Sequence, residues 1–101
     1  MKEKPFENKI KKFLKSNNCW FIKYWGGGIY TQEGVPDLIA CVNGNFVAIE
    51  VKGDGGKPSE LQKYNIEEII KSGGIALILY PEDFEDFKLL VRRLNSEWHE
   101  I

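Results

Sequence analysis

The positions of apolar and polar residues along the chain follow two alternating patterns. Apolar residues recur every three or four positions in three segments, which predicts amphipathic helices over residues 4–17, 59–72 and from 81 onward. Apolar runs predict four strands, over residues 19–24, 35–42, 46–51 and 75–80. We therefore expect an α/β fold of order αβββαβα, in which helices flank a mixed sheet.

The apolar stripes of these helices predict the core. They consist of Phe6, Ile10, Phe13 and Leu14 in the first helix, Leu61, Ile66, Ile69 and Ile70 in the second, and Phe84, Phe87, Leu90, Val91 and Leu94 in the third. The segment over residues 75–80 is an unbroken apolar run, which is typical of a strand that is buried on both faces.

Asn43 and Gly44 separate the second and third predicted strands. Asn-Gly is a strong signal for a two-residue type I′ turn, because both central residues of that turn need positive φ. If these residues form the turn, Asp37 lies directly opposite Glu50, and Lys52 shares the face of Glu50 because side chains alternate along a strand. A turn shifted by one residue would instead place Lys52 opposite Asp37. The three charged side chains share one face in either register.

Two carboxylates and an ammonium group at the end of an apolar hairpin need a physical explanation. Like charges that face each other across a sheet destabilise it, and a buried carboxylate pair loses a charge unless a cation lies between its members. Two carboxylates on adjacent strands suit Mg²⁺ or Mn²⁺, which also take waters and substrate phosphates as ligands. The sequence therefore predicts a divalent metal site at Asp37 and Glu50.

These residues resemble a known family in their order and spacing. The matching elements are, in chain order, Gly34-x-Pro36-Asp37, Glu50-x-Lys52 and a helix that carries Gln62. This series is similar to the signature of the VRR-NUC branch of the PD-(D/E)XK nucleases, whose fold is that of restriction endonucleases. The resemblance runs from an acidic residue in the first helix, Glu7, to the last strand.

The resemblance implies a division of roles among these residues in the hydrolysis of a DNA phosphodiester. Asp37, Glu50 and the backbone carbonyl of Val51 would hold Mg²⁺ or Mn²⁺, and Lys52 would take part in catalysis. Two nearby carboxylates favour the charged form of a lysine. We therefore expect Lys52 to orient the attacking water and to stabilise charge on the phosphate, rather than to act as the base.

Gln62 and Glu7 each have a structural and a functional interpretation. Ser59 and Gln62 form a capping box, which accounts for the glutamine by itself, and one amide is not expected to serve both a cap and a site. Glu7 lies near a helix N-terminus, where the helix dipole favours an acid. The resemblance instead places Gln62 in the active-site signature and implies that Glu7 acts in the metal site through a water.

A glycine-rich segment over residues 25–34 leads directly to Asp37. Glycines allow a backbone to approach a ligand closely, and aromatic rings can stack on exposed bases. We expect DNA contacts from Trp25, Gly26, Gly27, Gly28, Tyr30 and, in the connection over residues 53–58, Lys57. The segment matches no phosphate-binding fingerprint, so a simple strand connection is the alternative.

The composition bounds the class of protein. The chain has 101 residues, of which 43 % are hydrophobic, so we expect one folded domain over residues 1–101. No apolar run reaches the roughly 20 residues that span a membrane, and no signal-peptide pattern is present. Cys19 and Cys41 match no metal or redox spacing and are expected to be reduced thiols of a cytoplasmic protein. His99 is the one histidine and lies near the C-terminus, so we expect no histidine-based catalytic mechanism.

Charge is distributed unevenly along the chain. The net charge is −1, but residues 1–24 hold seven lysines against two acids, whereas residues 81–101 are acidic. Binding to phosphate needs only a basic patch, so the basic segment favours a nucleic-acid partner. A solvated lysine-rich helix face is the alternative.

The resemblance implies a metal-dependent DNA endonuclease that needs no small-molecule cofactor. Compact proteins of this type resemble phage and bacterial enzymes that cut branched DNA, including Holliday junctions, in DNA repair. We therefore expect activity in the cytoplasm of a bacterial or phage-infected cell. Symmetric cutting of a junction needs two active sites, which implies a homodimer. The alternatives are a nuclease that acts on linear or flap DNA and a non-catalytic DNA-binding module of the same fold.

Overall fold

The structure is a computed structural model and describes residues 1–96. Its helices and strands follow the predicted order, which confirms the α/β fold class and is compatible with a restriction-endonuclease-like core. In chain order they are α1 (Glu3–Ser16), β1 (Trp20–Lys23), β2 (Leu38–Val42), β3 (Asn45–Val51), α2 (Glu60–Lys71), β4 (Ile75–Leu79), the 3-10 turn η1 (Pro81–Asp83) and α3 (Phe84–Ser96).

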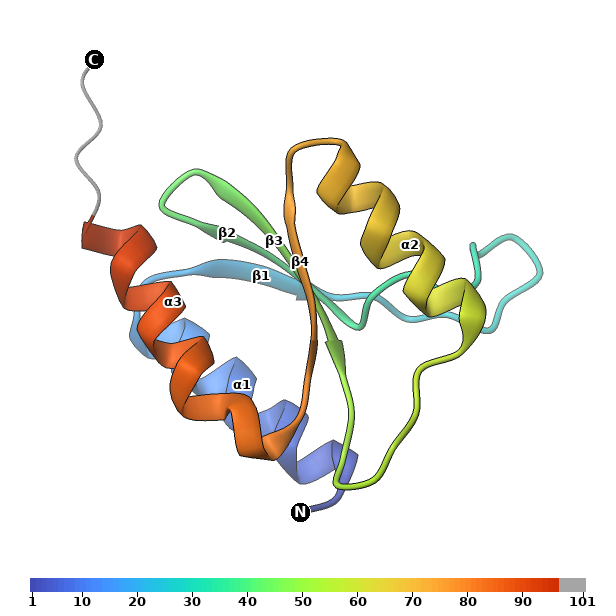
Figure 1. The fold of residues 1–101 in the computed structure, drawn as a ribbon, viewed down its shortest axis with the longest axis horizontal. Coiled ribbons are helices and arrows are strands. Elements are labelled where there is room, and N and C mark those ends of the chain that lie inside the picture. The colour runs from blue at the N-terminus through green and yellow to red at the C-terminus, as the bar shows by residue number, and fades with distance from the viewer. Residues whose placement is uncertain (97–101) are drawn as a thin grey trace.

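The four strands form one mixed sheet in the order β1-β2-β3-β4. β1 and β2 are antiparallel, as are β2 and β3, whereas β3 and β4 are parallel because α2 carries the chain back between them. α1 and α3 lie on one face of the sheet and α2 lies on the other (Figure 1). The sheet therefore separates two helical layers, and different side chains line its two faces.

The hairpin of β2 and β3 has the first of the two predicted registers. Val42 pairs with Asn45 and Leu38 pairs with Ile49. Asn43 and Gly44 have φ values of 49° and 83°, so both turn residues are in the left-handed region. The turn that the sequence favours therefore sets the pairing, and the shifted register is excluded.

The core fills the space between the sheet and the layer of α1 and α3. Alternate residues of β2 and β3 point into this layer and are buried, together with the apolar stripes of the two helices: Leu38, Ala40, Val42, Val47, Ile49, Val51, Phe6, Ile10, Leu14, Phe84, Phe87, Val91 and Leu94. Phe84 lies at the centre of an aromatic group in which its ring packs against Phe6 and Phe13 edge to face. This core holds the sheet in place, so the side chains on its opposite face extend from a fixed backbone.

Fewer residues are buried between α2 and the sheet than the sequence predicts. Leu61 and Ile70 are exposed, whereas Ile66 is buried. β4 is an edge strand and its first four residues are half-buried, so the prediction of a strand buried on both faces was wrong. The reason is that one helix covers only β3 and β4 on this face. The neighbouring half of the face leaves Trp20, Ile22 and Phe46 exposed.

Candidate active site

Asp37 is held at the end of the sheet by hydrogen bonds to both of its neighbouring strands. Its carbonyl oxygen accepts the Tyr24 N–H at 2.8 Å, directly after β1. Its side-chain Oδ2 accepts the Val51 N–H at 2.8 Å, at the end of β3. The carboxylate is therefore fixed between two strands, in the place that the hairpin register predicts.

Glu50 is the buried partner of Asp37. Its side chain is 2 % exposed, and it projects from β3 toward the face that carries α2. Glu50 Oε2 accepts a hydrogen bond from Gln62 Nε2 at 3.1 Å and lies 3.4 Å from Lys52 Nζ. Glu50 Oε1 is buried and accepts no hydrogen bond from residues 1–96. One oxygen of this carboxylate is thus saturated and the other is left without a donor.

The environment of Glu50 opposes a negative charge. Burial, and after it repulsion from the Asp37 carboxylate, raises the pKa of Glu50 to about 8, although Lys52 acts in the opposite direction. Near neutral pH the carboxyl therefore holds a proton when no cation is present. A divalent cation between the two carboxylates would favour the ionised form and displace that proton.

The residues present fit a divalent metal ion. Residues 1–96 contain no group of three or more acidic, histidine or cysteine side chains that could surround an ion without other ligands. A pair of carboxylates that is completed by water, a backbone carbonyl and a phosphate is typical of Mg²⁺. The buried Glu50 Oε1 without a donor is an oxygen that such a cation would satisfy. The donor set therefore suits a hard cation better than zinc.

Gln62 makes hydrogen bonds to the helix cap and to Glu50 at the same time. Its Oε1 accepts the Ser59 N–H at 2.8 Å, and its own N–H donates to Ser59 Oγ at 3.1 Å, which completes the predicted capping box. Its Nε2 meanwhile donates to Glu50. The expectation that one amide cannot do both was wrong, because the acceptor and the donor lie at different ends of the amide group.

Glu7 lies apart from the carboxylate pair. It is 2 % exposed on α1, on the other face of the sheet (Figure 1), and its carboxylate contacts Lys4, Lys11 and Lys23. Within residues 1–96 it makes no hydrogen bond or ion pair with Asp37 or Glu50. Its action on the metal site through a water stays a prediction.

The predicted DNA-contacting residues lie at the surface. Trp25, Gly26, Gly27, Gly28, Tyr30 and Lys57 are all exposed. The segment over residues 25–34 is anchored at its base, where Tyr24 Oη accepts the Gln32 N–H at 2.9 Å. Gly34 closes it with φ +76°, and a Cβ there would lie 2.6 Å from Leu61 Cγ, so only glycine fits against α2. The contact of Gly34 with α2 therefore fixes the backbone shortly before Asp37.

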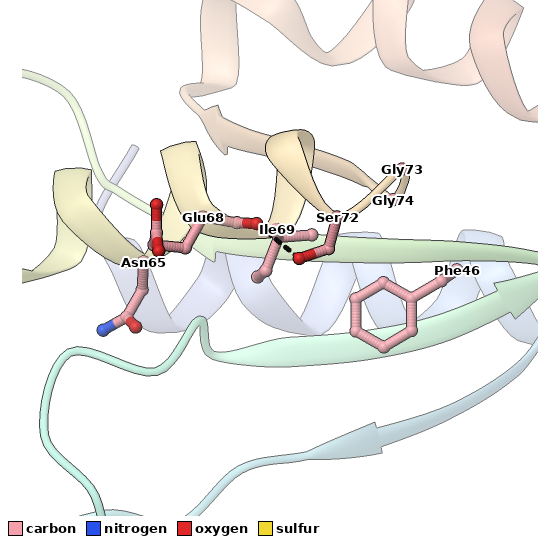
Figure 2. Close-up of a pocket in the computed structure, with 7 residues that line it drawn as sticks. All are labelled: Phe46, Asn65, Glu68, Ile69, Ser72, Gly73 and Gly74. Atoms are coloured by element: carbon pink, nitrogen blue, oxygen red, sulfur yellow. Dashed lines mark hydrogen bonds between the residues drawn. The ribbon is translucent and has the colours of Figure 1, made fainter.

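A pocket on the α2 side of the sheet lies away from the carboxylates (Figure 2). It is lined by Phe46 and by residues from the middle and the end of α2 and the turn after it: Asn65, Glu68, Ile69, Ser72, Gly73 and Gly74. Gln62, which contacts Glu50, lies at the opposite end of α2. The pocket therefore does not belong to the carboxylate site. His99 lies outside the described residues.

The lysines that surround Glu7 were not among the site residues predicted from the sequence. Glu7 and Lys11 are four residues apart on a helix, and this spacing is a readable signal for an ion pair. Lys23 comes from β1, and only the packing of α1 against the sheet shows that it lies beside Glu7.

The model of the archaeal Holliday junction resolvase (Hjc) family matches residues 1–97 of the chain. The matched region includes Asp37, Glu50, Lys52 and Gln62. No curated protein matches the chain. The Hjc family is PD-(D/E)XK nuclease-like, so the match confirms the superfamily to which the sequence was assigned, whereas its VRR-NUC branch stays a prediction.

Proposed function

Because the chain belongs to the archaeal Holliday junction resolvase (Hjc) family, we propose that it is a structure-selective endonuclease that cuts branched DNA with the aid of a divalent metal ion. The observation that carries the metal-dependent part is the pairing of Asp37 with a buried Glu50 whose Oε1 has no donor within the described residues. A DNA-binding module without catalysis would gain nothing from two facing carboxylates, because repulsion between them destabilises the fold. None of the helices in residues 1–96 is long and apolar enough to cross a membrane.

We assign the metal ligands to Asp37, Glu50 and the backbone carbonyl of Val51. When it is bound there, Mg²⁺ or Mn²⁺ would polarise the scissile phosphate and acidify a water molecule. The protein holds the site in shape from both sides. The Val51 N–H orients the Asp37 carboxylate, and the Gln62 amide orients Glu50. Such outer hydrogen bonds fix the direction in which a ligand presents its lone pairs.

Lys52 places a positive charge beside Glu50. Its side chain is 13 % exposed, and its Nζ lies 3.4 Å from Glu50 Oε2. We propose that the charged ammonium group orients the attacking water and stabilises the charge that develops on the phosphate. Lys52→Arg, which keeps the charge, is therefore expected to retain measurable cleavage, whereas Lys52→Met is expected to lose most of it. Equal and complete loss in both variants, measured on the same junction, would show that the charge is not what matters.

The two functions of Gln62 can be separated with its capping partner. Ser59→Ala removes only the cap, and is expected to lower the free energy of unfolding by about 1 kcal/mol with cleavage unchanged. Gln62→Ala removes the other side-chain hydrogen bond of the capping box and the hydrogen bond to buried Glu50, so cleavage should also fall by roughly tenfold or more. Denaturant unfolding and initial cleavage rates of both variants make the comparison. Equal cleavage rates in the two variants would reduce Gln62 to a helix cap.

We further propose that a homodimer is the active form. A four-way junction has two strands to cut, and a two-fold symmetric pair of subunits presents one site to each. The exposed Trp20, Ile22 and Phe46 form an apolar surface on the face that α2 leaves bare, and a second copy of the chain would cover it. Light scattering on the eluting protein gives the mass directly.

Labelled four-way junction, flap and linear duplex DNA test the proposal, each with Mg²⁺, Mn²⁺ or EDTA. We expect cleavage of the junction in both metals and none in EDTA. Preferred cleavage of the flap or the linear duplex would assign the same chemistry to another substrate. Binding without cleavage in any metal would show a non-catalytic DNA-binding module.

A further inference from the structure

The connection over residues 53–58 starts directly after Lys52 and is rich in glycine. Three of its six residues are glycines, which give its backbone wide conformational freedom. The Lys52 side chain itself carries its ammonium group on a flexible four-carbon stem. A mobile stem beside a mobile connection would not keep its charge in one place, yet Lys52 Nζ lies 3.4 Å from Glu50 Oε2. Contacts from other segments must therefore restrict both.

The backbone of the connection folds back over the Lys52 side chain. The Gly56 N–H donates to the Gly53 carbonyl at 3.1 Å, which closes a tight turn. A Cβ on Gly56 would lie 3.5 Å from both Cβ and Cδ of Lys52, so the glycine backbone faces the stem of the lysine. The same Cβ would lie 3.3 Å from the Gly53 carbonyl oxygen, so a side chain there would crowd the turn. The turn thus encloses the stem, and the Lys52 side chain is only 13 % exposed.

Tyr80 fastens this turn to the sheet. Its Oη donates to the Gly56 carbonyl at 2.7 Å. The tyrosine backbone is held on both sides, because it directly follows β4 and its carbonyl accepts the Asp83 N–H of η1 at 2.9 Å. Its side chain is half-buried. The hydroxyl group is therefore a donor in a fixed position next to a connection that is flexible by composition.

The strand that leads to Tyr80 is paired with the strand that leads to Lys52. β3 and β4 are parallel, with Val51 opposite Leu79, and the Lys52 N–H donates to the Leu79 carbonyl at 3.0 Å. Lys52 and Tyr80 therefore each follow a paired position directly. A series of contacts runs from the Tyr80 hydroxyl through the Gly56 backbone to the stem of Lys52.

We propose that Tyr80 is a positioning residue for Lys52. Its hydroxyl holds the Gly56 carbonyl, the anchored turn confines the lysine stem, and the ammonium group thereby stays beside Glu50. This inference rests on the proposed function, in which the Lys52 charge acts on the attacking water and the phosphate. Tyr80 acts through the turn and needs no contact with the DNA.

The reactivity of the Lys52 amine tests the positioning without DNA, metal or cleavage. A limiting amount of an acetylating reagent modifies exposed lysine amines faster than enclosed ones, and peptide mass spectrometry gives the rate at each lysine. Tyr80→Phe removes only the hydroxyl, so Lys52 should react several-fold faster than in the wild type. Lys71, which is exposed on α2, is the internal reference and should keep its rate. An unchanged Lys52 rate in this variant would overturn the proposal.

Single-turnover cleavage and DNA affinity, measured separately, test the catalytic consequence. Tyr80→Phe should lower the maximal rate of junction cleavage by roughly 2- to 10-fold, the range that one neutral hydrogen bond spans. Its affinity for the junction in EDTA should change by less than about twofold, because no charge is removed. A loss of affinity with an unchanged maximal rate would contradict a role through Lys52.

A second tyrosine provides the matched control. Tyr64 Oη lies 3.4 Å from Glu68 Oε1 on the exposed side of α2, so Tyr64→Phe also removes one hydroxyl and one hydrogen bond. This variant should cut at the wild-type rate and leave the Lys52 reactivity unchanged. If the Tyr80 hydroxyl contributed only to stability, Tyr80→Phe would likewise match the wild type in both measurements when these are made well below its melting temperature.

The outcomes distinguish this inference from the proposed function. If the wild-type chain cuts junctions but the maximal rate is the same in Tyr80→Phe, the positioning role is wrong and the nuclease assignment stands, even if Lys52 becomes more reactive. If Lys52 becomes more reactive in Tyr80→Phe but the wild-type chain cuts no DNA, the anchor on the lysine is present and the proposed function itself fails.

Discussion

Asp37→Asn and Glu50→Gln are each expected to reduce junction cleavage by more than about a hundredfold while the protein still binds the junction. Loss of an outer hydrogen-bond partner of a metal ligand costs roughly 10- to 100-fold, so loss of a ligand should cost more. Both substitutions keep the shape of the side chain. Asparagine in particular retains an oxygen that can accept the Val51 N–H, so the end of β3 should stay in place. Single-turnover cleavage in Mg²⁺ and Mn²⁺ measures the effect.

A matched control separates loss of a ligand from loss of negative charge. Glu60→Gln removes a carboxylate whose side chain is 93 % exposed on α2 and which pairs with Lys63, so it should cut at the wild-type rate. In EDTA, the Asp37 variant should bind the junction as tightly as the wild type or more tightly, because it removes a charge that repels phosphate. The Glu50 variant should bind as the wild type does, because the raised pKa of Glu50 leaves that carboxyl uncharged near neutral pH without a cation. Metal-dependent cleavage by either variant at a rate near that of the wild type would contradict the assignment of the site.

The metal-free protein is expected to become less stable as the pH rises from about 5 to 8. The pKa of Glu50 is about 8 in the folded state, above its ordinary value of 4.5, so the folded chain holds a proton that the unfolded chain has already lost in this range. Stability falls with pH wherever the folded state binds more protons, by up to about 1.4 kcal/mol for each pH unit. Melting temperatures in EDTA should therefore drop by several degrees across the window.

Divalent metal should reverse this loss. The ion competes with the proton on Glu50, so the gain in melting temperature from Mg²⁺ or Mn²⁺ should be larger near pH 8 than near pH 5. Glu50→Gln cannot ionise, and its melting temperature in EDTA should vary less over the same range and show no gain from metal. Glu7 does not interfere with the measurement, because its pKa is lowered and it titrates below this window. A wild-type melting temperature in EDTA that rises steadily from pH 5 to 8 would contradict the raised pKa.

The carboxylate pair could be predicted because local signals determine its geometry. Asn43 and Gly44 tolerate the positive φ values that a two-residue turn needs, and the turn sets the register. Once the register is fixed, strand alternation places Asp37 opposite Glu50 on one face. Every step of this reasoning depends on residues within a short stretch of the chain, and so the sequence alone sufficed.

The remaining features depend on contacts between distant segments. The bond from Gln62 to Glu50 joins α2 to β3, and its existence follows from where the helix lies on the sheet rather than from the capping motif. The cluster around Glu7 depends in the same way on the packing of α1 against β1. Leu61 and Ile70 have helical spacing that suits burial, but a single helix on this face leaves them in solvent. Periodicity predicts which residues share a face, whereas the surrounding layers decide whether that face is covered.

The amide of Gln62 ties the first turn of α2 to the interior acid of the sheet. If that turn unfolds, Glu50 loses the hydrogen-bond donor that orients its Oε2. A ligand that reorients Glu50 must likewise break or shift the hydrogen bonds at the start of the helix. The connection over residues 53–58 joins the end of β3 to this turn, and Tyr80 Oη anchors it by donating to the Gly56 carbonyl at 2.7 Å. Insertions or deletions in this connection would move the first turn of α2 and so change the orientation of Glu50, without altering any residue of the carboxylate pair.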